Sequence, residues 1–109
     1  MANLVILESA QRELEEIAQL HRNLVGPHSA RNITDLILDT LSHVEMFPLS
    51  GHIPRDKELR NGGYRYVIAG KYICMYRLIG EEVYAYHIAH GARNYPTLFK
   101  RLLKEDCLD

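Results

Sequence analysis

The 109-residue sequence contains no tryptophan, only two cysteines and no apolar run long enough to cross a membrane. Cys74 in an apolar segment and Cys107 near the end do not form the framework of a disulfide-rich secreted domain. The first apolar stretch, residues 5–7, is too short for a signal peptide. The sequence therefore predicts a soluble, cytoplasmic protein without a membrane segment.

An overall basic excess is also lacking, because the formal net charge is −1. This excludes a strongly basic nucleic-acid-binding protein. Residues 55–77 nevertheless hold six basic and two acidic residues, a local net charge of +4, which allows a basic face. The six histidines show no paired ligand spacing, so neither a metal nor a cofactor is expected. Length and an ordinary globular composition predict one domain over residues 1–109.

The first half of the chain has helical periodicity. Residues 2–7 resemble a short strand, after which Ser9 is expected to cap a helix whose apolar residues recur every three or four positions. Gly26-Pro27 ends that helix, and a second one begins at Pro27 or Ser29 and ends at Phe47-Pro48. The short connection predicts an antiparallel helical hairpin.

The second half changes to a period of two. A long loop at 47–63 precedes three strands at 64–68, 72–79 and 82–90, joined by Gly-first pairs typical of type II′ hairpin turns. Two-residue turns would place Arg65 opposite Tyr76 and Cys74 opposite His87. Pro96 then opens a short amphipathic helix. The predicted fold is α+β, in the order β-α-α-β-β-β-α, with an antiparallel meander sheet packed by the helical hairpin.

Several short motifs add a family resemblance. Residues 59–65 contain L-R-N-G-G-Y-R, Tyr76-Arg77 is followed by Gly80, and residues 88–95 read I-A-H-G-A-R-N-Y. Together with the element order, they resemble the RelE/ParE family of toxins, with Asn94 in place of the usual Asp. The resemblance implies a toxin that arrests growth until a cognate antitoxin binds it. RelE-like members cut ribosome-bound mRNA, whereas ParE-like members poison DNA gyrase.

Candidate catalytic residues follow from the resemblance and from the chemistry of RNA cleavage. Metal-free cleavage needs proton transfer and positive charge on the phosphate, and an arginine fork matches phosphate oxygens. Arg65 and Arg93 fall where RelE-like toxins keep two catalytic arginines. His90 and Tyr95 are the candidates for moving protons. Three further basic residues are expected to contact RNA: Arg55, Lys57 and Arg60.

Two departures from RelE leave the mechanism open. The upstream lysines of RelE are replaced by basic residues in a different spacing, and Phe99, which cannot transfer a proton, stands near the expected catalytic tyrosine. The first hypothesis is a ribosome-dependent, metal-independent mRNA endonuclease. The alternative is a gyrase inhibitor that cuts nothing. An inactive relative that acts only as a co-repressor is a weaker third hypothesis. His87, inside a strand, is expected to be a packed or hydrogen-bonded histidine.

Overall fold

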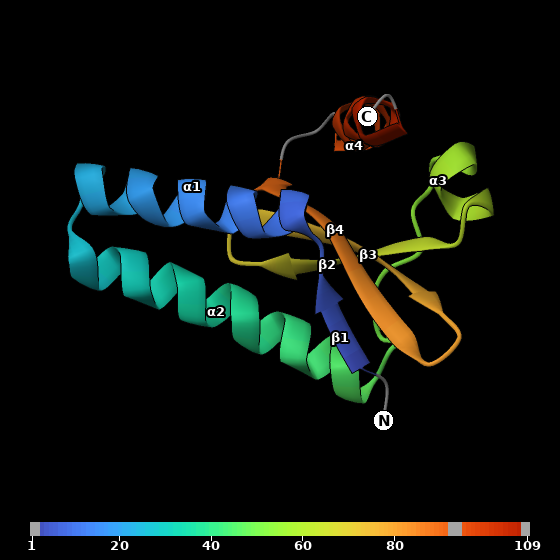
Figure 1. The fold of residues 1–109 in the computed structure, drawn as a ribbon, viewed down its shortest axis with the longest axis horizontal. Helices are drawn as coiled ribbons and strands as arrows, with labels where there is room; N and C mark the ends of the chain where they lie inside the picture. Colours follow the sequence, from blue (N-terminus) through green and yellow to red (C-terminus); the bar gives the residue numbers. More distant parts are fainter. Residues whose placement is uncertain (1–2, 92–94, 108–109) are drawn as a thin grey trace.

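The computed structural model describes residues 3–91 and 95–107, in which helices cover both faces of a four-stranded sheet (Figure 1). The predicted α+β class and element order are confirmed, with one addition: the long loop contains a five-residue helix. The elements are β1 (Asn3–Ile6), α1 (Glu8–Leu24), α2 (Pro27–Met46), α3 (Lys57–Asn61), β2 (Tyr64–Ala69), β3 (Tyr72–Ile79), β4 (Glu82–His90) and α4 (Tyr95–Cys107).

The helical hairpin α1–α2 packs on one face of the sheet. Gly26, at a φ of 143°, makes the reversal, and α2 begins at Pro27, the first of the two predicted starts. Ser9 does not cap α1; the cap position is Leu7, and the Ser9 hydroxyl donates instead to the backbone oxygen of Tyr86 at 2.8 Å. The prediction of the cap was wrong because the hydroxyl has a partner on β4 that local sequence does not reveal.

The two hairpin turns have the predicted length and position. Ala69 pairs with Tyr72 and Ile79 with Glu82, so each turn contains two residues. Gly70 and Gly80 both have a φ of 62°, which glycine adopts without strain. The predicted pairing of Arg65 with Tyr76 is confirmed.

The predicted pairing of Cys74 with His87 is wrong. The register shifts between Met75 and Tyr76, so that Cys74 pairs with Ile88 and Met75 with His87. Tyr86 is the extra residue of this β-bulge. Because side chains alternate along a strand, the bulge turns Ile88 toward the helical hairpin and Ala89 toward α4.

The first strand makes the sheet mixed rather than a pure antiparallel meander. β1 pairs with β4 in parallel, giving the order β1-β4-β3-β2. One core lies between the hairpin and the sheet, and a smaller one lies under α3 and α4 around Phe99. Cys74 is a buried thiol whose pKa burial raises to about 12. Within the described ranges, none of the helices has the length and apolar character that crossing a membrane requires.

Candidate functional site

Arg65 and Tyr76 hold the start of the long loop. Nη1 of Arg65 donates to the backbone oxygens of Leu49 at 3.2 Å and Gly51 at 3.1 Å. The buried Tyr76 hydroxyl donates to the Pro48 oxygen at 2.7 Å and accepts from the Gly51 N–H at 2.9 Å. Burial is the main reason why the pKa of Tyr76 is raised. The motif arginine therefore binds backbone carbonyls of its own chain.

Gly51 fits this contact because it has no side chain. A Cβ built at this position would lie 2.4 Å from the Tyr76 oxygen and 2.6 Å from a ring carbon. Since Tyr76 is fully buried, its ring cannot move aside cheaply. The close approach of loop and ring thus requires glycine at residue 51.

His90 lies at the exposed end of β4. Its ring is 5.6 Å from the ring of Tyr72, at an angle of 82°. It also lines a largely apolar groove of about 520 Å³ between α1, β4 and α4. Other residues of this groove are Glu13, Glu16, Ile17, Leu20, Leu98 and Leu102. His90 is therefore accessible, in a groove that also carries two carboxylates.

Tyr95 begins α4 and packs against aromatic rings. Its ring centroid is 5.1 Å from that of Tyr66 and 6.0 Å from that of Phe99. Burial, with a hydrogen bond to Tyr66, raises the pKa of Tyr95 to about 12. The phenol consequently keeps its proton at neutral pH and is a poor base there.

The three candidate RNA-contacting residues are exposed around α3. Arg55, Lys57 and Arg60 lie in or just before this helix. Asp56 caps it by accepting from the Leu59 N–H at 3.1 Å. The same carboxylate accepts from Lys100 Nζ at 2.8 Å, which ties α3 to α4. The basic residues therefore form a surface cluster around α3, and the Asp56–Lys100 ion pair holds this helix against α4.

The described candidate catalytic residues do not converge. Arg65 pairs with Tyr76 on the hairpin face, whereas its strand neighbours Tyr64 and Tyr66 pack with Tyr95 in the core under α4. Arg65 and Tyr95 thus point to opposite faces. His90 pairs with Tyr72, four residues along β3 from the partner of Arg65, which is about 13 Å at the rise of a strand. Arg93 lies outside the described residues.

A second motif arginine, Arg77, packs among tyrosines. Its guanidinium carbon is 4.9 Å from the Tyr64 ring centroid and 5.3 Å from that of Tyr86. Nη2 donates to the Tyr86 hydroxyl at 2.7 Å, and Nη1 donates to the Gly62 oxygen at 3.3 Å. Arg77 therefore joins the Tyr76-Arg77 motif to the motif at residues 59–65.

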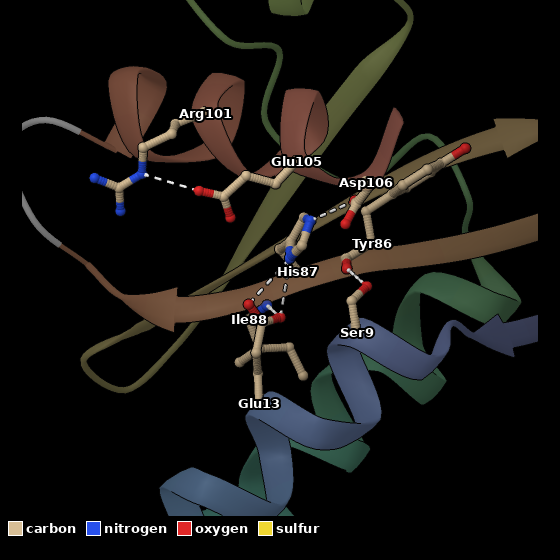
Figure 2. A network of polar contacts seen from close by, with 8 residues as sticks. All are labelled: Ser9, Glu13, Tyr86, His87, Ile88, Arg101, Glu105 and Asp106. Carbon is tan, nitrogen blue, oxygen red and sulfur yellow. Dashed lines mark hydrogen bonds and ion pairs between the residues drawn. The ribbon is translucent and has the colours of Figure 1, made fainter. Parts of the chain in front are cut away.

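A buried polar network escaped the sequence prediction as a group. His87, 2% exposed, bonds Glu13 through Nδ1 and Asp106 through Nε2, as Figure 2 shows. Burial lowers the pKa of His87, but the hydrogen bonds and charges of Glu13 and then Asp106 outweigh it, so the net shift is upward. The expectation of a hydrogen-bonded histidine is confirmed. Its partners are 74 and 19 residues away, where no local pattern marks them.

Comparisons with known proteins place this fold. The family model for the ParE toxin of the type II toxin–antitoxin system, parDE, matches residues 4–95. A chain of the chromosomal ParDE system from P. aeruginosa superposes with a TM-score of 0.71 at 18% identity, covering 84% of this chain and 98% of that one. A chain of the RelBE2 toxin–antitoxin complex from Mycobacterium tuberculosis superposes with a TM-score of 0.62 at 17% identity. The match covers 83% of this chain and 98% of that one. At such identities the likeness shows a shared fold. No curated protein matches the sequence.

Proposed function

Because the chain belongs to the ParE toxin family of type II toxin–antitoxin systems, we propose that it arrests growth by binding and inhibiting DNA gyrase without cutting RNA. The observation that carries the proposal is the dispersal of the described catalytic candidates. Arg65 and Tyr95 lie on opposite faces of the sheet, and His90 lies at a distant end.

The chemistry of RNA cleavage supports the same choice. A phosphodiester needs charge and proton-transfer groups within hydrogen-bond reach of one phosphate. Nη1 of Arg65 already donates to two loop carbonyls, and the pKa of Tyr95, about 12, keeps that phenol protonated. Neither residue is arranged to act on a phosphate together with His90.

Cleavage of ribosome-bound mRNA is the second candidate function. The exposed cluster of Arg55, Lys57 and Arg60 favours it, because such side chains bind phosphates. Arg93 and His90 would then supply charge and a proton near the end of β4. This hypothesis requires a site formed without Arg65.

A cognate antitoxin is the proposed inhibitor of this toxin. The two similar structures are described as a ParDE system and a RelBE2 toxin–antitoxin complex. The apolar groove between α1 and α4 supports the presence of a protein partner, because an apolar groove can accept the apolar face of a partner helix.

Two assays on one preparation separate the candidate functions. The toxin is purified from its antitoxin complex, added to gyrase supercoiling reactions, and expressed briefly in cells for mapping of mRNA ends. We expect loss of supercoiling, double-strand breaks and intact mRNA. Codon-spaced mRNA ends with unimpaired gyrase would contradict the proposal.

Two variants refine the result. Arg93→Ala tests the arginine that only the nuclease requires for chemistry, and the triple change of Arg55, Lys57 and Arg60 to Gln tests RNA contact. If mRNA ends appear and vanish in both variants, the nuclease is established. If both variants still inhibit gyrase, those residues lie outside the gyrase-binding surface.

A further inference from the structure

The geometry of His87 determines its protonation state. Nδ1 lies 3.0 Å from Oε2 of Glu13 on α1, and Nε2 lies 2.8 Å from Oδ2 of Asp106 on α4 (Figure 2). A neutral imidazole carries only one N–H donor, so it can bond only one of two ionised carboxylates. With both carboxylates in place, the ring is the imidazolium ion, buried between two negative charges.

The two carboxylates are not held equally. Glu13 also accepts the backbone N–H of Ile88 at 3.0 Å, which fixes it to β4. The Glu13 side chain is 19% exposed, whereas that of Asp106 is 40% exposed and belongs to the last turn of α4. When the ring loses a proton, the remaining N–H, on Nδ1, still donates to Glu13. The lone pair of the deprotonated Nε2 then points at a lone pair of the Asp106 carboxylate, and the two repel. Asp106 can leave that contact because water is already near it.

We propose that the Glu13–His87–Asp106 network is a pH-dependent switch that fixes the C-terminal end of α4 to the sheet when His87 is protonated and releases it when His87 is neutral. The groove between α1 and α4 contains Glu13 and Leu102, so release widens this partner-accessible surface. The proposal concerns α4 alone and holds whichever target the toxin has.

Other contacts confine the movement to the end of the helix. Phe99 is fully buried, and Lys100 is paired with Asp56 at 2.8 Å, so the first half of α4 stays in place. The charges that face His87 are Glu13 from α1 and Asp106 from α4. The remaining described ion pair on α4, Arg101 with Glu105 at 4.0 Å, is exposed and lies within the helix.

NMR of the full chain over a pH series tests the switch. The ring carbon of His87 reports its protonation, and amide shifts and ¹H–¹⁵N NOE values report the order of residues 101–106. We expect His87 to titrate above 6.5, its ordinary pKa. As pH rises, the NOE values of residues 101–106 should fall with the same midpoint as the His87 titration. The NOE values of the Phe99 and Ile88 amides should stay unchanged.

Three variants make the test specific. Asp106→Asn keeps the side-chain shape and removes the charge, so the His87 midpoint should fall and the step in residues 101–106 should disappear. His87→Gln should abolish the step as well. Glu105→Gln, on the neighbouring residue, is the matched control and should retain it. An α4 that stays ordered while His87 loses its proton, or a step that persists in Asp106→Asn, would overturn the proposal.

Discussion

At the scale of single residues, hydrogen bonding explains two motif residues without invoking catalysis. One hydroxyl, that of Tyr76, bonds two backbone groups of the loop, and Arg65 bonds two more. Backbone groups that folding removes from water need partners, because leaving them unpaired is costly. The register that places Arg65 opposite Tyr76 was predictable from the turn. Their loop partners were not, because loop conformation has no period in sequence.

Tyr76→Phe tests this role directly. The variant leaves the buried Gly51 N–H and the part-buried Pro48 carbonyl without this partner. We expect the free energy of unfolding, measured in urea, to fall by about 1–3 kcal/mol. The matched control is Tyr84→Phe, whose half-buried hydroxyl contacts the Glu82 carboxylate. A control loss of under about 0.5 kcal/mol is expected, and equal losses in both variants would refute the role.

At the scale of elements, the strands and turns were predictable and the irregularities were not. Glycine placed first in each turn fixed the two-residue connections. The bulge at Tyr86 carries no glycine or other local marker, so the predicted pairing of Cys74 with His87 was wrong by one residue. The short helix α3 was missed because five residues are too few to show helical periodicity.

Gly80→Ala tests the turn between β3 and β4. No atom beyond the two adjoining residues lies within 4 Å of the added Cβ, so backbone strain at a φ of 62° is the main effect. We expect a loss of about 1–2 kcal/mol in the free energy of unfolding, measured by urea denaturation. The control Glu81→Ala alters the adjacent turn residue, which has no positive φ, and should cost under about 0.5 kcal/mol. A Gly80 variant as stable as the control would show that the turn conformation differs.

At the scale of the whole molecule, the sheet separates two cores, and a few polar contacts connect the helices across it. His87 joins α1 on one side of the sheet to α4 on the other, whereas Asp56 joins α3 to α4 on the same side. Hydrophobic periodicity predicted the layers, because each amphipathic face needs a partner surface. It could not predict these links, because each depends on the final positions of residues far apart in the chain.

The His87 link predicts a stability that decreases on the alkaline side. Its pKa in the folded protein is raised above the ordinary 6.5, so the folded state binds the proton more tightly than the unfolded chain does. This contribution is fully present below 6.5 and is lost as pH rises through the folded pKa. Asp56 acts in the opposite sense: Lys100 lowers its pKa, and its contribution is lost in acid.

Urea unfolding at a series of pH values from 5.5 to 9, in the wild type and two histidine variants, measures the effect. In His87→Gln the free energy of unfolding should decrease less between the ordinary and the raised pKa than in the wild type. The exposed His28 on α2 provides the control, because His28→Gln makes the same substitution at a surface histidine. We expect that control to follow the wild-type curve. Identical pH dependence in all three proteins would mean that folding does not shift the pKa of His87, and it would contradict the proposed link.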